Sequence, residues 1–140
     1  MSTQSLKRAR TLKNARGWTL IEMVVVMALI VILAGLATAQ YRGAMTRSKE
    51  AVLKEDLFRM RDAIDQYYAD KNKYPADLQA LVSDGYMREV PKDPFTESAD
   101  TWQAIPAEPD PSNPNLQPGI YNVKSGTELT AVDGTQYADW

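Results

Sequence analysis

The chain has 140 residues with no cysteine and no histidine, so disulfide bonds, thiol nucleophiles, Cys/His zinc sites and histidine-based catalysis are excluded. Its formal net charge of −2 is unevenly divided, because residues 1–17 hold five basic and no acidic residues whereas residues 41–140 hold 11 basic and 17 acidic residues. A body with a net charge of −6 argues against nucleic-acid binding, which requires a basic surface.

An apolar helix is the first predicted element, and it runs from Trp18 to Ala39 with Glu22 as its only charged residue. Its 22 residues span ~33 Å as a helix, which is enough to cross the core of a bilayer. The basic residues before it predict that the N-terminus stays cytoplasmic and that the rest of the chain lies across the membrane. These basic residues are Lys7, Arg8, Arg10, Lys13 and Arg16.

Three interpretations of the apolar segment compete. It is a permanent anchor, a secretory signal with a cleavage site at the small residues 37–39, or a self-assembling helix marked by Glu22. A lone carboxylate in hydrocarbon costs ~2.5 kcal/mol or more. A disposable signal has no reason to carry that cost, so Glu22 favours the third interpretation.

The stretch GWTLIE, Gly17 to Glu22, resembles the cleavage site of type IV pilins and pseudopilins. In that family a basic leader ends in glycine, a membrane prepilin peptidase cuts after it, the new N-terminal residue is methylated, and the fifth mature residue is glutamate. The resemblance implies cleavage after Gly17, methylation of Trp18 and an assembly role for Glu22. Trp18 departs from the family, which usually has Phe or Met there.

The resemblance also supplies a partner for the carboxylate of Glu22. Cleavage after Gly17 leaves a positive amine on Trp18, and methylation keeps that charge. Pairing with Glu22 of a neighbouring subunit would neutralise both groups in an apolar filament core and set the axial stagger between subunits. The alternative is that Glu22 extends to the membrane surface without a partner.

The helical pattern continues beyond the apolar segment to about Asp70. Apolar residues recur on one helical face from Leu53 to Tyr67, and Glu50/Lys54 and Glu55/Arg59 have the spacing of exposed i, i+4 ion pairs. We therefore expect one helix from about Thr19 to Asp70, whose second half is amphipathic and needs a globular partner. The apolar face comprises Leu53, Leu57, Met60, Ile64 and Tyr67.

A second, short helix is predicted over residues 75–82, after the break at Asn72-Lys73-Tyr74-Pro75. Pro75 suits its first turn, and Leu78, Leu81 and Val82 would pack on the long helix. A rigid turn follows in the sequence VPKDP, residues 90–94.

Strands are expected over residues 101–105 and 120–124, with Tyr121 and Val123 on one face. The proline-rich segment between them, residues 106–118, reads as an extended, exposed connection. The end of the chain, residues 125–140, reads as a loop with a turn at Asp133-Gly134.

These elements predict an α+β fold, in which a long N-terminal helix packs on a small C-terminal domain with a short helix and a small antiparallel sheet. The chain divides into a leader, residues 1–17, that is removed; a transmembrane and assembly half-helix, residues 18–40; and a periplasmic globular domain, residues 41–140. The proline-rich loop 106–118 belongs to the third part.

The stretch YPADLQALVSDGYMREVPKDPF is similar to the major pseudopilins of type II secretion. In these proteins a Tyr-Pro opens the short helix, and a Pro-Lys-Asp-Pro turn precedes a small sheet. The resemblance implies a structural subunit, not an enzyme, that polymerises into a pseudopilus and drives protein export across the outer membrane. The implied partners are further copies of the chain, the prepilin peptidase, an inner-membrane assembly platform and minor pseudopilins.

Two other functions stay open. One is a major or minor pilin of a type IV pilus, with the same N-terminal segment and a different surface. The other is a secreted enzyme or binding module released after Ala39, although residues 41–140 contain no glycine-rich phosphate loop and no nucleophile motif.

Calcium is the cofactor that the resemblance implies, because major pseudopilins bind calcium in their C-terminal loop. Calcium takes six to eight oxygen ligands from flexible loops. The resemblance makes Asp133 and Asp139 the first side-chain candidates and Glu128 the third, with Trp140 packing back on the sheet to seal the loop. The alternative is an acidic surface loop without metal.

Overall fold

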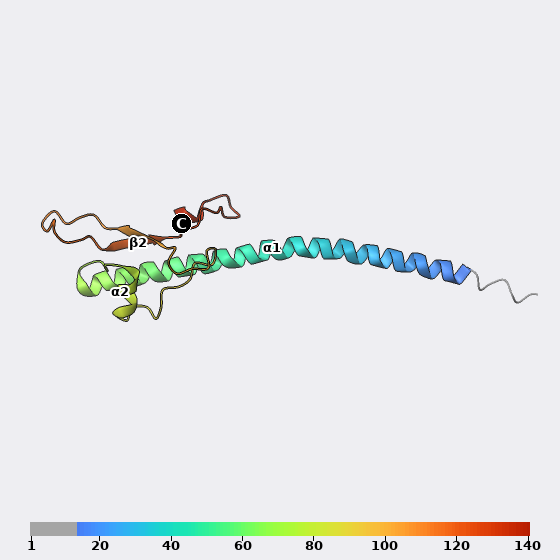
Figure 1. Cartoon of the computed structure of the whole chain (residues 1–140), viewed down its shortest axis with the longest axis horizontal. Helices are drawn as coiled ribbons and strands as arrows, with labels where there is room; N and C mark the ends of the chain where they lie inside the picture. Colours follow the sequence, from blue (N-terminus) through green and yellow to red (C-terminus); the bar gives the residue numbers. More distant parts are fainter. Residues whose placement is uncertain (1–13) are drawn as a thin grey trace, which may run out of the picture. The chain divides into compact units, whose positions relative to one another are not determined.

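The computed structural model describes residues 14–140, with side chains from residue 18 onward. Most of the predicted leader, residues 1–13, lies outside the described residues. By its internal contacts the chain divides between Ala44 and Met45 into two compact units. The described part of the first unit, residues 14–44, is helix, and the second unit contains the remaining elements (Figure 1).

Helix α1, Asn14–Lys71, is a single helix of 58 residues (Figure 1). It confirms the long helix predicted from the sequence, and the chain is already helical at Asn14, five residues before the predicted start. The helix ends at Asn72, which takes a left-handed conformation with φ 50° and donates its N–H to the Tyr68 carbonyl at 2.8 Å. Asparagine tolerates this conformation better than most residues.

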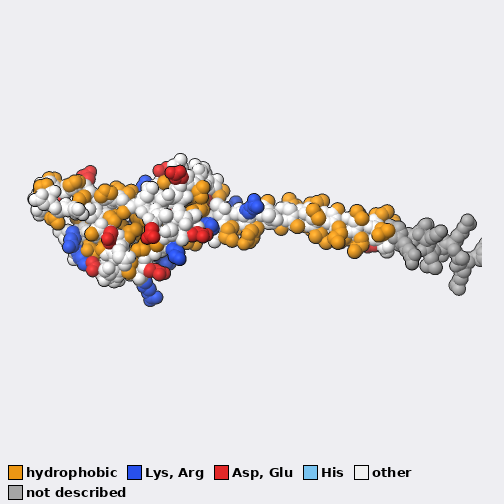
Figure 2. Space-filling view, in the orientation of Figure 1, with side chains coloured by type: hydrophobic (Ala, Val, Ile, Leu, Met, Phe, Trp, Pro, Cys, Tyr) orange, Lys and Arg blue, Asp and Glu red, His pale blue; other side chains and the backbone are white. Residues whose placement is uncertain are grey.

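In the first unit, every described side chain from residue 18 to residue 44 is exposed. Figure 2 shows apolar side chains covering this part of α1, whereas acidic and basic side chains gather on the second unit. Among residues 14–140, α1 is a helix long and apolar enough to cross a membrane. A helix that is apolar on all sides needs lipid or other helices around it, so α1 supports single-pass membrane anchoring.

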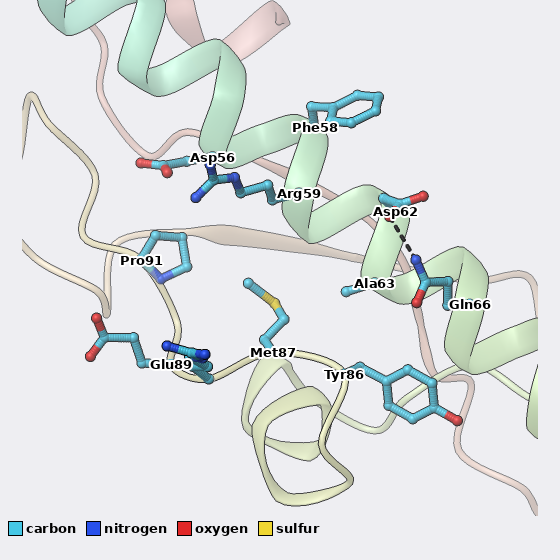
Figure 3. A pocket seen from close by; sticks show the side chains of 11 residues that line it. Asp56, Phe58, Arg59, Asp62, Ala63, Gln66, Tyr86, Met87, Glu89 and Pro91 are labelled. Atoms are coloured by element: carbon cyan, nitrogen blue, oxygen red, sulfur yellow. Dashed lines mark hydrogen bonds between the residues drawn. The ribbon is translucent and has the colours of Figure 1, made fainter.

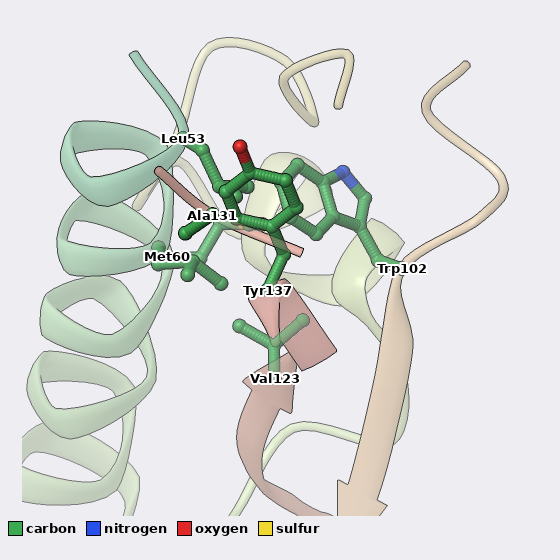
Figure 4. Close-up of a cluster of buried hydrophobic side chains, with 7 residues drawn as sticks. Leu53, Met60, Trp102, Val123, Ala131 and Tyr137 are labelled. Atoms are coloured by element: carbon green, nitrogen blue, oxygen red, sulfur yellow. The ribbon is translucent and has the colours of Figure 1, made fainter. Parts of the chain in front are cut away.

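The core of the second unit is built on the predicted apolar face of α1. Its five side chains are at most 6% exposed, which confirms the helical spacing found in the sequence. Figure 4 shows Leu53 and Met60 of α1 beside Trp102, Val123 and Tyr137, which come from later segments. A neighbouring cluster joins Ile64 and Tyr67 to the short helix and the sheet.

Helix α2, Leu78–Ser83, begins three residues later than predicted. Asp77 caps it, since its Oδ1 accepts the N–H of Ala80 at 2.7 Å, which satisfies a free donor of the first turn. Pro75 does not open the helix: it is buried, and its carbonyl accepts the N–H of Ile120 at 2.8 Å. The predicted role of Pro75 was therefore wrong, because this tertiary hydrogen bond holds it beside the sheet.

Leu81 is fully buried against α1, as predicted, and the half-buried Leu78 packs on the same core. Val82 is also half-buried, but it belongs to neither core cluster among the described residues. The short helix therefore packs on the core mainly through one leucine face.

Strands β1, Gln103–Pro106, and β2, Ile120–Lys124, pair antiparallel. Asn122 lies opposite Ile105, but Ile120 lies opposite Pro106, so Tyr121 is an extra residue that forms a β-bulge. The bulge changes the burial pattern: Ile120 and Val123 are buried, whereas Tyr121 is 47% exposed. The prediction that Tyr121 and Val123 lie on one face was wrong, because the sequence pattern does not reveal the bulge.

The proline-rich connection between the strands is exposed, as predicted, but it is not extended throughout. Its N–H groups at Asn113 and Leu116 donate to the carbonyls of Asp110 and Asn113 at 3.0 and 3.1 Å, which forms successive turns. Pro106, the first residue assigned to this loop, instead ends β1.

Candidate assembly site and the anchored C-terminal tail

Glu22 lies on α1 four residues after Trp18, so both side chains occupy the same helical face. Trp18 is 74% exposed, and Glu22 is exposed beside it. Together with Ile21, Val25 and Val26 they line a shallow hollow of about 260 Å³. Gly17, which precedes Trp18, lies within the helix bounds of α1. The predicted cleavage, methylation and assembly residues are therefore adjacent on one helix.

The surroundings of Glu22 are apolar. The side chains that line its hollow, apart from Glu22 itself, are hydrophobic, and no hydrogen bond or ion pair to Glu22 is found within the described residues. A carboxylate that becomes buried in such surroundings is stable only when it is paired. Burial of this helix face would therefore require that the charge of Glu22 be neutralised.

The VPKDP turn clamps the start of the C-terminal tail, which we define as residues 125–140. Asp93 is fully buried, and its Oδ1 accepts the N–H of Phe95 at 2.8 Å while its Oδ2 accepts the hydroxyl of Ser125. Ser125 is also fully buried. The rigid turn predicted from the sequence thus has a second role, since it holds a residue 32 positions later.

Two glycines that flank β2 permit close backbone contacts. A Cβ at Gly119 would lie 2.6 Å from the carbonyl oxygen of Tyr74, and one at Gly126 would lie 2.0 Å from the carbonyl oxygen of Thr101. Neither distance is compatible with a side chain, so the stretch GIYNVKSG needs glycine at both ends.

Glu50 of α1 contacts the tail and does not pair with Lys54, contrary to the prediction. Its Oε1 accepts the N–H of Val132 and the hydroxyl of Tyr137, each at 2.8 Å. Lys54 instead lies over the ring of Trp140, with its Nζ 4.4 Å from the ring centroid. The tail offers hydrogen-bond donors and an aromatic ring, which compete successfully with the local ion pair.

The other predicted ion pair is confirmed: Arg59 Nε lies 2.8 Å from Glu55 Oε1, and both side chains are exposed. Such a pair contributes at most about 0.5 kcal/mol. Glu50 lies on the same helix but differs from Glu55, because its carboxylate contacts the C-terminal tail and not a neighbouring basic side chain of α1.

Arg61 makes a second connection between α1 and the tail. Its Nε donates to Asn122 Oδ1 at 2.8 Å, and its terminal nitrogen donates to the main-chain oxygens of Val123 at 3.0 Å and Trp140 at 2.6 Å. One guanidinium therefore joins the helix, β2 and the tail. The fixed fork of donors in arginine suits this arrangement.

The tail itself is folded. A turn at residues 131–135 closes through the Gly134 N–H and the Ala131 carbonyl at 3.0 Å, and Gly134 has φ 88°, which confirms the predicted turn. The segment η1, Tyr137–Asp139, follows as a short 3₁₀ helix. Ala131 and Tyr137 are buried in the core.

The three predicted calcium ligands are not gathered in one place. Asp133 Oδ1 accepts the N–H and the hydroxyl of Thr135 at 3.0 and 2.6 Å, which lowers the pKa of Asp133. Asp139 lies in η1, and Glu128 is exposed. Within residues 14–140 no group of three acidic side chains forms a metal site, so the donors do not fit the implied ion in this conformation. Calcium binding stays an untested prediction.

Trp140 packs back on the protein as expected, against the core cluster that includes Val123 of β2. Its ring meets Tyr137 edge-on, with centroids 4.9 Å apart, and its Nε1 donates to Thr135 Oγ1 at 2.8 Å. Trp140 therefore closes the tail against Tyr137 and α1.

A groove of about 430 Å³ separates α1 from residues 86–91 (Figure 3). Met87 lies in the groove, and Phe58 at its edge is 67% exposed. Burial raises the pKa of Asp56 in the groove wall, while Arg59 opposes that shift. Mixed charges around exposed apolar side chains are typical of a protein contact surface.

Tyr137 predicts a loss of stability at alkaline pH. Burial, followed by the hydrogen bond to Glu50, raises the pKa of Tyr137 from 10.0 to about 12. Because the folded pKa is raised, this stabilisation is complete below pH 10 and is lost as the pH rises towards 12. We expect the free energy of unfolding to fall by up to ~1.4 kcal/mol per pH unit in that interval.

Denaturant unfolding of the full chain in detergent between pH 9 and 12 measures this effect. The Tyr137→Phe variant is the control, because it retains the ring and lacks the titrating hydroxyl. Equal alkaline slopes in the two proteins would contradict the assignment to Tyr137.

Comparison with known proteins identifies the N-terminal segment first. Residues 12–38 match the prokaryotic N-terminal methylation motif, and this range includes Gly17, Trp18 and Glu22. No solved structure gave a significant match.

Relatives match a larger part of the chain. The type II secretion system core protein G of Klebsiella michiganensis is 30% identical over 99 residues, which cover 59% of this chain and 70% of that protein. Its counterpart in Pseudomonas aeruginosa is 34% identical over 99 residues, with the same coverage. The fimbrial protein EcpC of Eikenella corrodens is 34% identical over 80 residues, or 54% of this chain and 52% of that protein.

The described part of the methylation motif, residues 14–38, lies on α1, and the secretion relatives are matched over more than two thirds of their length. The α+β architecture agrees with the fold that the pseudopilin resemblance implied. The chain therefore belongs to the family of type II secretion system core protein G, the major pseudopilins, and is a pilin-like structural subunit.

Proposed function

We propose that the chain is cleaved after Gly17, methylated at Trp18 and polymerised through α1 into the pseudopilus of a type II secretion system. The observation that carries this proposal is the exposed apolar surface of residues 18–39 with Glu22 set into it. The growing filament would push folded proteins through a pore in the outer membrane. The chain itself performs no catalysis in this proposal.

In this proposal the same apolar surface of α1 lies first in the bilayer and then in the filament. Before assembly the apolar half of α1 lies in the bilayer, where its backbone hydrogen bonds are satisfied within the helix. In the filament the apolar side chains pack against those of other subunits. Pairing of Glu22 with the amine of a neighbouring Trp18 removes the cost of two separate buried charges.

The location and partners follow from this scheme. The basic residues before α1 favour a cytoplasmic N-terminus and a periplasmic C-terminal domain, with the chain held in the inner membrane by one span. The partners are the prepilin peptidase, further copies of the chain, an inner-membrane assembly platform and minor pseudopilins.

A type IV pilus subunit is the second candidate, favoured by the match to the fimbrial protein EcpC. That match covers 52% of the relative, less than the 70% covered in the secretion proteins. Electron microscopy at native expression distinguishes the two: long surface fibres containing this chain indicate a pilus, and their absence together with lost export in a deletion strain indicates a pseudopilus.

The processing step is tested by the mass of the mature protein. We expect intact protein from the native membrane to begin at Trp18 and to carry one methyl group on its amine. A Gly17→Leu control is expected to keep the leader, because the implied peptidase cuts after glycine. A mature chain that begins at Gln40 would instead establish cleavage by a signal peptidase.

A further inference from the structure

We propose that Glu50 and Arg61 of α1 form a latch that holds the C-terminal tail in place without a bound metal ion. This inference concerns the second unit alone and does not depend on filament assembly. It departs from the calcium site that the family resemblance implied, and it rests on contacts made by this chain's own side chains.

Glu50 provides the first half of the latch. A single oxygen, Oε1, accepts both the N–H of Val132 and the hydroxyl of Tyr137, each at 2.8 Å. Hydrogen bonds to a carboxylate are about twice as strong as those between neutral groups. Tyr137 is 1% exposed, so its hydroxyl has little access to water as an alternative acceptor. Loss of the carboxylate would leave this buried donor without its partner.

Arg61 provides the second half. It lies eleven residues after Glu50, about three helical turns, and therefore on nearly the same face of α1. Its guanidinium donates to the Trp140 main-chain oxygen at 2.6 Å and to the Val123 carbonyl at 3.0 Å. The two helix residues thus hold the tail before and after the turn at Gly134.

Aromatic packing closes the latch. Phe95 stacks on Tyr137 with ring centroids 4.2 Å apart, and Trp140 meets the same Tyr137 ring edge-on. Lys54 covers Trp140 from the helix side. Such contacts are favourable beyond the burial of apolar area, so they reinforce the polar contacts.

The contacts of Glu50 are the reverse of a calcium site, and the cation that meets the main-chain oxygens of Val123 and Trp140 is the guanidinium of Arg61. A calcium ion gathers carbonyl and carboxylate oxygens around a positive charge. Here the tail presents N–H and O–H donors, from Val132 and Tyr137, to a negative charge on α1. The carboxylate oxygen Oδ1 of Asp133 is already used by Thr135. The tail is therefore held by two charged side chains of α1, the carboxylate of Glu50 and the guanidinium of Arg61.

Hydrogen exchange of the full chain in detergent, read by mass spectrometry, tests the latch. We expect peptides from the tail to exchange at the same rate in millimolar calcium and in chelator. In Glu50→Ala we expect their exchange to rise at least tenfold to a hundredfold, because one charge-assisted hydrogen bond alone has roughly that effect and Glu50 accepts two. Glu50→Gln retains an acceptor oxygen and should show a smaller increase.

Glu55→Ala is the matched control, because Glu55 lies on the same helix and its partner is the exposed Arg59. It should leave tail exchange unchanged. Should Glu50→Ala unfold the unit, Tyr137→Phe decides the case: it keeps the ring, removes one donor of the latch, and should accelerate exchange in the tail but not in the core of α1. Slower tail exchange with calcium in the unaltered protein, or unchanged exchange in Tyr137→Phe, would overturn the proposal.

Discussion

Replacing Glu22 with valine is expected to abolish filament assembly while the chain still enters the membrane. The substitution removes the only charge between residues 18 and 39, so insertion becomes more favourable. In a filament, the amine of Trp18 would then be buried without a partner. Removing one member of a buried ion pair costs ~3–5 kcal/mol. Because the loss recurs at every subunit contact, we expect no detectable filament.

Membrane fractionation and electron microscopy of sheared filaments measure insertion and assembly separately. Glu22→Gln keeps the volume and removes the charge, so it should also fail to assemble if charge pairing is the cause. Ile21→Val changes a neighbouring apolar side chain and keeps Glu22, so it should assemble normally. Filaments of normal length and number from Glu22→Val would rule out the pairing mechanism.

Replacing Gly126 with alanine is expected to destabilise the second unit severely. The new Cβ would lie 2.0 Å from the carbonyl oxygen of Thr101 and 3.1 Å from its carbon. Neither side can move easily, since Thr101 leads into the buried Trp102 and the preceding residue, Ser125, is held by Asp93. Overpacking costs ~1–3 kcal/mol, and a backbone collision belongs at the upper end. A loss of ~3 kcal/mol lowers the melting temperature of a small domain by roughly 12–24 °C.

Thermal melting of the full chain in detergent, followed by near-ultraviolet circular dichroism, measures this loss. Gly134→Ala is the control: Gly134 has φ 88°, but no atom lies within 4 Å of a Cβ built there. That variant bears only the backbone strain of about 1–2 kcal/mol and should melt well above Gly126→Ala. Equal melting temperatures for Gly126→Ala and the unaltered protein would show that Thr101 does not approach Gly126 in solution.

The sequence by itself determined the long helix and its division into an apolar first half and an amphipathic second half. The spacing from Leu53 to Tyr67 predicted the buried face of α1, because a helix places every third or fourth side chain on one side. The uninterrupted apolar run predicted a helix able to cross a membrane, and the isolated Glu22 after Gly17 pointed to the family. These features are local, so neighbouring residues are sufficient to define them.

The tertiary structure decided the features that depend on distant partners. Helix α2 is capped by Asp77, which accepts the N–H of Ala80 three residues later. Pro75 lies outside the helix because its carbonyl accepts a hydrogen bond from the N–H of Ile120. The bulge at Tyr121 depends on the pairing of β2 with β1.

The contacts of Glu50 are the clearest example of a feature that depends on distant partners. Its spacing to Lys54 predicted an exposed ion pair, which contributes at most about 0.5 kcal/mol. Its actual partners, Val132 and Tyr137, lie 82 and 87 residues later in the chain. The buried hydroxyl of Tyr137 gains more from a carboxylate than an exposed ammonium group does, because little water reaches it to replace the carboxylate. Only the folded chain brings these donors to Glu50, so the tertiary structure determines how the C-terminal tail is held.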